Sequence, residues 1–260
     1  MATFAAVRHP ARTRQRGVSL VELAIGLLIL SLIIGGLLVP LASQVEQSRV
    51  GQAQRQLEEI REALLGFALA NGRLPCPASA ASNGIESPVG GGVCTNPWNG
   101  FVPAVTLGLS QVDEAGYSID AWGFAQNRVR YAVTTGSAGA FTTAGQMRAI
   151  GMAALAPDLR VCRSGASITG AGNAATCMAP DLLSQNAVAV IYSLGANDAT
   201  GGTSQDEAQN PNPNSANNDR AFVSRVRAAP GAAAAEFDDL VTWLSPNVLY
   251  SRMVTAGQLP

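Results

Sequence analysis

The stretch RQRGVSLVELAIGLLIL, from Arg14 to Leu30, opens a long apolar run. The run covers Val18–Val39, 22 residues in which Glu22 is the only charged side chain. As an α-helix this run is about 33 Å long, enough to cross the roughly 30 Å hydrocarbon core of a membrane. The sequence therefore predicts a membrane-spanning helix near the start of the chain.

Two ordinary targeting signals explain only part of this segment. A secretory signal peptide has an apolar region of about 7–15 residues that ends at a small-x-small cleavage site. The run is longer than this, and its nearest candidate site, Pro40-Leu41-Ala42, has proline where the cleavage site has a small residue. A plain signal anchor explains the length and the basic flank but leaves Glu22 unexplained. An acid within a span costs roughly 2.5–3.5 kcal/mol, so Glu22 indicates a partner.

A partner arises if the chain is cut between Gly17 and Val18, because the new amine is positive and lies one helical turn from Glu22. Glu22 also lies in the first turn, where the helix dipole favours negative charge. A basic leader ending in Gly17, an apolar helix and a Glu at the fifth position after the cut resemble the type IV pilin and type II secretion pseudopilin superfamily. Val18 stands where the family usually has Phe.

The resemblance implies a route of processing and assembly. A prepilin peptidase on the cytoplasmic side would cut after Gly17 and methylate the new amine of Val18. Glu22 of one subunit would then meet the N-terminal amine of its neighbour in a helical filament; the alternative role for Glu22 is recognition by the peptidase. Pro40 resembles a helix-kinking proline that many pilins carry near this position.

The helical pattern continues beyond the apolar run. Apolar residues recur every three or four positions along one face: Leu41, Val45, Ala53, Leu57, Ile60, Leu64 and Phe67. Asn71-Gly72 and then Pro75 end the pattern. The sequence predicts one helix over residues 18–70, about 80 Å long. Its stripe is expected to pack on a soluble domain, because Arg49 interrupts a coiled-coil seam.

From residue 76 the chain is rich in Gly, Ala, Ser, Asn and Pro, and its apolar runs are short. Four of these runs predict strands: 129–135, 187–194, 221–226 and 240–244. Ser245-Pro246 predicts the start of a last helix that ends at Gly257, and 195–218 predicts a loop or a partly disordered segment. The expected fold class is α+β, with the long N-terminal helix packed on a small antiparallel sheet and a C-terminal helix.

Four segments are expected: a leader over 1–17, a transmembrane and assembly helix over 18–41, its amphipathic continuation over 42–72, and a periplasmic head over 73–260. The leader holds four arginines, the only histidine and no acid, which favours a cytoplasmic N-terminus. Residues 18–260 hold 13 arginines and 18 acidic side chains, a net charge of −5. This composition excludes nucleic-acid binding through a basic patch.

The four cysteines form two local pairs, Cys76 with Cys94 and Cys162 with Cys177. Even, local pairing indicates disulfides and an oxidising compartment. We therefore expect two disulfides in a periplasmic head, with four buried thiols as the alternative.

Catalysis is not expected. Residues 18–260 contain neither His nor Lys, which excludes Ser-His-Asp and Cys-His nucleophiles, histidine metal sites and Schiff-base chemistry. Three adjacent carboxylate pairs remain, and such pairs are more often solvated surface or helix caps than acid–base pairs: Asp113/Glu114, Asp206/Glu207 and Asp238/Asp239.

The family resemblance extends to a metal. Asp120-Ala121-Trp122-Gly123, Arg130-Tyr131 and the run YSLGAND over 192–198 are similar to the major pseudopilins, in which the following loop binds calcium. Calcium takes six to eight oxygens, which loop carbonyls and four acids would supply: Asp198, Asp206, Glu207 and Asp219. Loop length and acid spacing depart from the family and from the EF-hand pattern, so a solvated acidic loop is the alternative.

The expected function is structural, as a minor pilin of a type IV pilus-like filament. The protein would lie in the bacterial inner membrane with its head in the periplasm and then enter the pilus. Its partners would be a prepilin peptidase, other pilin subunits and the inner membrane. The alternatives are a pseudopilin of a type II secretion system and a single-span anchored binding domain that never polymerises. Only a prepilin loses residues 1–17.

Overall fold

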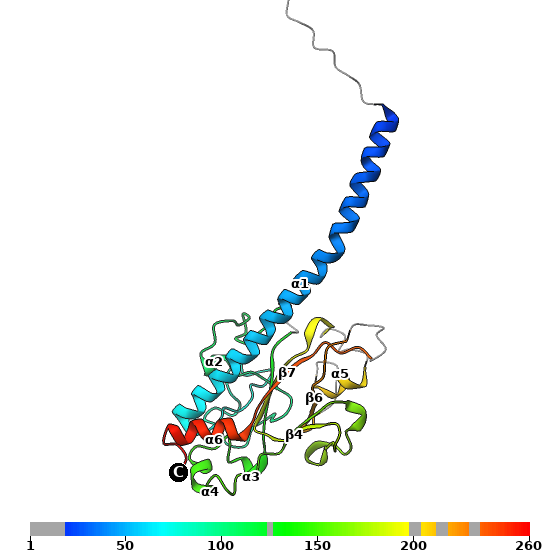
Figure 1. Ribbon diagram of the computed structural model, residues 1–260. Helices are drawn as coiled ribbons and strands as arrows, with labels where there is room; N and C mark the ends of the chain where they lie inside the picture. Colours follow the sequence, from blue (N-terminus) through cyan, green and yellow to red (C-terminus); the bar gives the residue numbers. More distant parts are fainter. Residues whose placement is uncertain (1–18, 124–126, 198–203, 212–217, 229–234) are drawn as a thin grey trace, which may run out of the picture. The chain divides into compact units, whose positions relative to one another are not determined.

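The computed structural model describes residues 19–123, 127–197, 204–211, 218–228 and 235–260, with the helical backbone alone over 34–42 (Figure 1). The chain divides into two compact units, Met1–Ser48 and Arg49–Pro260, and each is described by itself. Helix α1, Leu20–Asn71, begins in the first unit, continues through Pro40 and ends in the second. The predicted helix over 18–70 is confirmed to within two residues at each end.

The end of α1 follows from two neighbouring residues. Asn71 Nδ2 donates a hydrogen bond of 2.9 Å to the carbonyl of Phe67, in the last turn of the helix. Gly72 then takes a φ of 66°, a left-handed conformation that glycine adopts without steric cost. The predicted stop at Asn71-Gly72 is therefore confirmed.

The second unit is built on a four-stranded sheet with the strand order β1-β2-β5-β7, and every neighbouring pair in it is antiparallel. The strands are β1, Gly100–Phe101; β2, Arg130–Val133; β5, Ala189–Ser193; and β7, Leu240–Leu244. Strands β2 and β5 are fully buried, and both lie within runs that the sequence predicted to be strands. The antiparallel sheet expected from the sequence is thus present.

A second sheet has three strands in the order β4-β3-β6. Its strands are β3, Leu159–Cys162; β4, Leu182–Ala187; and β6, Ala221–Val223. Strand β3 pairs antiparallel with β4 but parallel with β6, so this sheet is mixed rather than antiparallel. Buried side chains from the two sheets form one hydrophobic cluster, which includes Tyr192 and Phe222.

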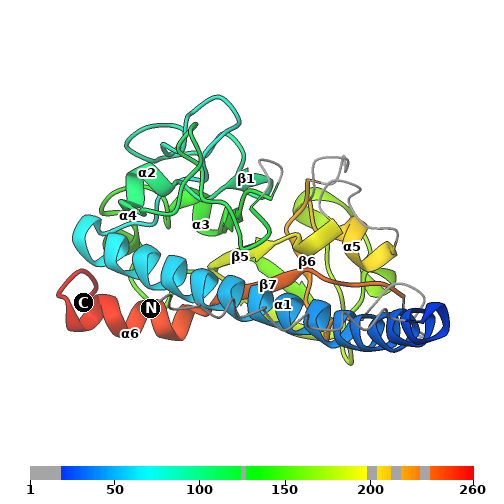
Figure 2. The same cartoon turned by 90° about the horizontal axis from the view of Figure 1, so that it is seen from above.

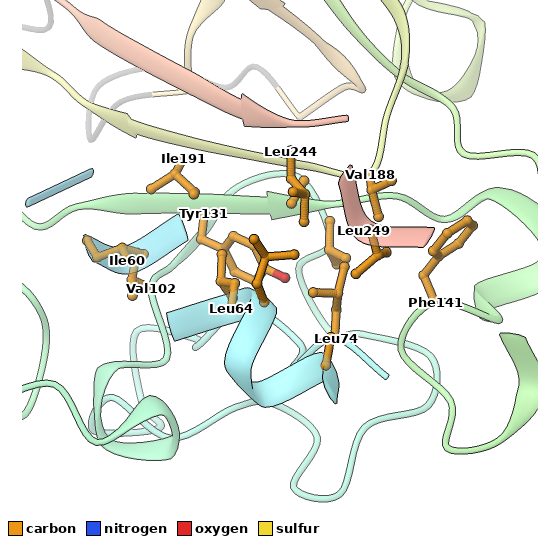
Figure 3. Close-up of a cluster of buried hydrophobic side chains, with 14 of the residues drawn as sticks. Ile60, Leu64, Leu74, Val102, Tyr131, Phe141, Val188, Ile191, Leu244 and Leu249 are labelled. Atoms are coloured by element: carbon orange, nitrogen blue, oxygen red, sulfur yellow. The ribbon is translucent and has the colours of Figure 1, made fainter. Parts of the chain in front are cut away.

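The larger hydrophobic cluster joins α1 to the four-stranded sheet. Four residues of the predicted stripe are buried in it, namely Ala53, Leu57, Ile60 and Leu64. Figure 3 shows Ile60 and Leu64 on α1 facing Tyr131, Ile191 and Leu244, which come from β2, β5 and β7. The stripe therefore packs on the head, as predicted for this part of the helix. Val45, which precedes the second unit, is 46% exposed.

Helix α6, Pro246–Thr255, follows β7 directly. Ser245 caps it by accepting a hydrogen bond from the Val248 N–H, and Pro246 occupies the first turn, as the sequence predicted. Gln258, just beyond the helix, donates a 2.9 Å hydrogen bond to the carbonyl of Leu69 on α1. Figure 2 shows α6 lying beside the C-terminal part of α1, and Leu249 and Met253 bury their side chains in the same cluster as α1.

Short helical turns connect the strands: α2, Ala104–Leu107; α3, Gly136–Gly139; α4, Gln146–Ile150; α5, Gln205–Gln209; and the 3-10 turns η1, Gly165–Ser167; η2, Gly172–Ala174; and η3, Gly195–Asn197. The segment 195–218 was predicted to be a loop, but its described residues include η3 and α5. The cause is local, because Ser204 accepts a hydrogen bond from the Glu207 N–H and caps α5.

Candidate functional site

The first turn of α1 is fixed by Ser19. Its side-chain oxygen accepts a hydrogen bond of 3.2 Å from the backbone N–H of Glu22. Its carbonyl accepts the first helical bond from the N–H of Leu23, at 3.1 Å. Ser19 is thus the N-cap of α1, a position that Ser favours because the hydroxyl satisfies one of the unpaired donors of the first turn.

Glu22 is the acidic residue of this first turn and its side chain is exposed. Within the part of the chain that the structure describes, its carboxylate has no hydrogen-bond partner. Gly17 and Val18, the residues of the predicted cleavage site, lie outside the described residues. The structure therefore gives Glu22 the predicted position at the helix start, and its pairing with an amine stays a prediction.

The helix that follows Glu22 carries its apolar side chains on the outside. Leu20 is 86% exposed, Leu28 60% and Leu32 68%, and every large apolar residue from 20 to 33 is more than half exposed. A shallow groove of about 300 Å³ lies along this face, between Leu20, Val21, Ala24, Ile25 and Leu28. Exposed apolar surface of this extent requires a covering partner, such as lipid or other helices.

Among the described helices, none combines the length and the apolar character that a membrane crossing requires.

Comparison with known families finds one match in this region. Residues 12–38 match the family model described as the prokaryotic N-terminal methylation motif. The match covers the end of the basic leader from Arg12 to Gly17, then Val18, Glu22 and nearly all of the apolar run. The chain is a prepilin-like protein. The motif indicates the superfamily of type IV pilins and type II secretion pseudopilins.

No curated protein and no solved structure matches this prepilin. The motif implies processing by a prepilin peptidase, pilus-like assembly, and anchoring in the inner membrane through the N-terminal segment. Members of the pilin-like family are generally structural proteins rather than enzymes.

Both expected disulfides are present in the head of the prepilin. Cys76 is bonded to Cys94 and Cys162 to Cys177, with Cα–Cα distances of 5.3 and 6.2 Å. The first bridge closes the loop after α1, and the second closes the segment that follows β3.

The acids predicted to bind calcium do not gather at one point. Asp198 lies outside the described residues. Asp206 accepts hydrogen bonds from the Ser164 hydroxyl and the Gly165 N–H and forms an ion pair with Arg225. Asp219 accepts from the side chain of Gln209 and from the Ala221 N–H, and its burial raises its pKa.

Glu207, the fourth predicted ligand, instead lies with Asp238 and Asp239. One carboxylate oxygen of each residue is within 4.8 Å of those of the other two. Glu207 is 2% and Asp239 3% exposed. Glu207 Oε1 accepts hydrogen bonds from the Asp238 N–H and from Asn197 Nδ2, at 2.9 and 3.1 Å. The structure thus forms a carboxylate cluster, Glu207–Asp238–Asp239, that differs from the predicted set.

The carboxylate cluster fits a hard cation in its donor chemistry. Among the residues that the structure describes, Glu207 Oε2 and Asp238 Oδ1 are buried and have no hydrogen-bond partner. Gly195, at φ 68°, brings its backbone so close to Asp238 that an added Cβ would lie 2.5 Å from the Asp238 carboxylate. Carboxylate oxygens are the ligands that calcium prefers.

The burial and mutual repulsion of these carboxylates change the pKa of Asp238. Burial, together with the charge of Glu207, raises the pKa of Asp238 to about 7. The N–H groups of Ala196 and Asn197, which donate to Asp238 Oδ2, and the charge of Arg227 oppose this rise in the pKa. Near neutral pH, the ionised cluster therefore favours a positive partner.

The contribution of Asp238 and Asp239 to this site was not predicted, although the order of the strands could have indicated it. They directly precede β7, and β7 pairs antiparallel with β5, so that Leu240 lies opposite Ser193. An antiparallel pair brings the residues before one strand next to the residues after the other. The loop after Ser193 is where calcium was expected, and the pairing of two predicted strands places Asp238 beside it.

Proposed function

We propose that this prepilin-like protein is a minor subunit of a type IV pilus-like filament. The observation that carries the proposal is the exposed apolar segment of α1, which begins with a capped turn containing Glu22 and matches the methylation motif. A filament core built from such helices covers the apolar side chains that each helix leaves exposed.

In this proposal a prepilin peptidase removes residues 1–17, and the new N-terminus is an N-methylated Val18. The subunit is held in the inner membrane, with the N-terminus cytoplasmic and the head periplasmic, until it enters the filament. Its disulfides support an oxidising compartment for the head. The protein has no catalytic role, in keeping with the absence of His and Lys from residues 18–260.

Glu22 has its main role during assembly. Its carboxylate pairs with the Val18 amine of a neighbouring subunit. The two opposite charges then neutralise each other inside the apolar core of the filament. An acid in the first turn is tolerated before assembly because the helix dipole favours it there. The size of the head and its long polar loops support the assignment as a minor subunit of the filament.

The test is to shear surface filaments from cells and to quantify this protein in the filament and inner-membrane fractions. The proposal predicts that the protein co-purifies with filaments at a small fraction of the amount of the main subunit. A secretion-system pseudopilin would stay with the envelope fraction and would be required for export of a secreted protein. A plain anchored domain would be absent from filaments and would keep residues 1–17.

A further inference from the structure

We propose that a groove at one end of the three-stranded sheet binds an acidic peptide segment of a partner protein, one that carries an apolar side chain beside its carboxylate. The groove has a volume of about 700 Å³, which is within the range of ligand pockets in proteins. All of its lining residues belong to the second unit, so its occupation does not depend on filament assembly.

The topology of the three-stranded sheet places the groove. Strand β3 pairs antiparallel with β4, so its last residue, Cys162, lies opposite the first residue of β4, Leu182. Strand β6 runs parallel to β3 and also ends beside Cys162. The residues that follow β3 and β6 therefore meet the start of β4 at the same end of the sheet. The groove is lined there by Arg163, after β3, by Leu183, in β4, and by the segment 224–228, after β6.

The lining of the groove is positively charged. It includes three arginines, Arg163, Arg225 and Arg227, and no acidic side chain among the residues that the structure describes. The head as a whole has the opposite sign, since residues 73–260 hold 10 arginines and 13 acidic side chains, a net charge of −3. The groove is thus a local basic surface on an acidic head, and it favours a negatively charged ligand.

Two of the three guanidinium groups have partners in the head. Arg225 forms an ion pair with Asp206. Arg227 lies over the ring of Trp122, 6.0 Å from its centre. Arg163, in contrast, is exposed, and within the described part of the chain its guanidinium has no hydrogen-bond or ion-pair partner. Arg163 is therefore available to a ligand carboxylate, which a guanidinium binds through two parallel N–H···O bonds.

The groove also exposes apolar side chains. Leu183 is 38% and Val226 86% exposed, and both line the groove. A carboxylate alone would leave these side chains in water, whereas a peptide with an apolar residue beside the acid covers them. Nucleic acid is a poorer fit, because none of the described lining residues is aromatic and could stack on a base.

Addition of a strand to β4 is not part of the proposal. Strand β4 lies at the edge of its sheet, and no described strand pairs with its outer edge. Its ladder with β3, however, shifts register twice, between Leu159 and Val161 and between Val161 and Cys162. Such irregularities discourage pairing with a further strand. The side chains of the groove, rather than the backbone of β4, therefore determine what binds.

The test is selection of a random peptide library, displayed on phage, against the full-length protein in detergent. The selected peptides should share an acidic residue next to a large apolar one, and labelled synthetic copies should bind the protein in fluorescence-anisotropy titrations. Arg163→Ser should raise the Kd of these peptides about tenfold, because it removes charge-assisted hydrogen bonds. Val226→Ser should raise their Kd about fivefold, because it removes apolar contact area.

Each variant has a matched control outside the groove. Arg148→Ser, on α4, removes another exposed guanidinium, and Val93→Ser removes a valine that is 85% exposed. Both controls should leave the Kd of the selected peptides unchanged. All four side chains are exposed, so the variants should fold, and an unchanged Tm checks this for each of them.

The proposal is overturned if the library yields no binder, or if the controls weaken binding as much as Arg163→Ser does. Equally tight binding of polyglutamate, which lacks an apolar residue, or of a single-stranded oligonucleotide would show that the groove captures negative charge alone. A protein that dimerises in detergent, and that becomes a monomer in Arg163→Ser or Val226→Ser, would show that a second copy of the chain occupies the groove instead.

Discussion

The Glu22 backbone N–H donates to the Ser19 hydroxyl at 3.2 Å, and this is one half of a capping box. In the complete box, the Glu carboxylate returns a bond to the N–H of the capping residue. That second bond is absent from the described residues around the start of α1. Ser19 therefore caps the helix alone, and the Glu22 carboxylate is not occupied within its own helix.

The capping role of Ser19 predicts the effect of Ser19→Ala. Loss of a Ser cap costs about 1 kcal/mol, so the Glu22 amide should exchange its hydrogen about fivefold faster. Ser19→Thr should keep most of the protection, because Thr also caps. Hydrogen-exchange mass spectrometry of the detergent-solubilised protein measures this. Ser31→Ala, which removes a hydroxyl from within α1, is the control and should leave the Glu22 amide unchanged.

Glu22→Ala should separate processing from assembly. We expect the variant to be cut after Gly17 and to remain in the inner membrane. It should fail to enter filaments, because a neighbour's amine would be left in an apolar core. Loss of one member of a buried ion pair costs about 3–5 kcal/mol. Immunoblots of membrane and sheared fractions measure both steps.

If Glu22 instead serves recognition by the peptidase, the alanine variant should accumulate with residues 1–17 uncut. Normal processing together with normal filament levels would show that the pairing role is wrong. Glu59→Ala, a change at another acid on α1 with an exposed side chain, is the matched control and should assemble normally.

Arg73 and Glu86 form a buried, two-bonded ion pair, with N–O distances of 2.8 and 2.7 Å. Arg73→Met should lower the free energy of unfolding by about 3–5 kcal/mol, because it leaves a buried carboxylate unpaired. Chemical denaturation at neutral pH measures this loss. Arg61→Met removes the partly buried partner of Glu58, whose own side chain is exposed, and should cost less than about 1 kcal/mol.

The pH dependence of stability provides a second readout for this pair. Burial alone would raise the pKa of Glu86, but hydrogen bonds and charge from Arg73, with the N–H groups of Cys76 and Gly90, lower it below 4.5. A lowered pKa gives stability that is present above 4.5 and is lost as pH falls through the folded-state value. Arg73→Met should show less of this acid-dependent loss, and an unchanged acid profile would contradict the assignment to Glu86.

Each disulfide should contribute to stability through the loop it closes. The bridges join residues 18 and 15 positions apart, and loops of that length are worth roughly 3 kcal/mol each in the chain-entropy model. Replacing Cys162 and Cys177 together by Ser should lower the free energy of unfolding by roughly 3 kcal/mol. Chemical denaturation measures this loss as a lower midpoint. Thiol labelling of the native protein, denatured without reductant, should find no free cysteine. Full labelling would contradict both bridges.

Much of the fold was predictable because its determinants are local. The start of α1, its stop at Asn71-Gly72 and the cap of α6 at Ser245 each depend on a few adjacent residues. Strands β2, β5 and β7 were predicted because they are apolar runs in the buried sheet. Strand β4 was missed, because it is an edge strand with largely polar sequence and exposed side chains.

The remaining features depend on residues that are distant in sequence. The parallel pairing of β3 with β6 joins Arg160 to Ala221, which no local pattern specifies. The carboxylate cluster was half predicted, since Glu207 was expected to bind a metal and Asp238 was considered only with its neighbour Asp239. The ion pair of Arg73 with Glu86 was missed for the same reason, because nothing in the spacing of 13 residues indicates a contact.

The N-terminal mass of the protein extracted from membranes or filaments tests the central claim most directly. Processing as a prepilin predicts that the chain starts at Val18 and carries one methyl group on its amine. Tandem mass spectrometry of the N-terminal peptide distinguishes this species from all others. A chain that starts at Met1, or one cut near Ser43 as by a signal peptidase, would contradict the account.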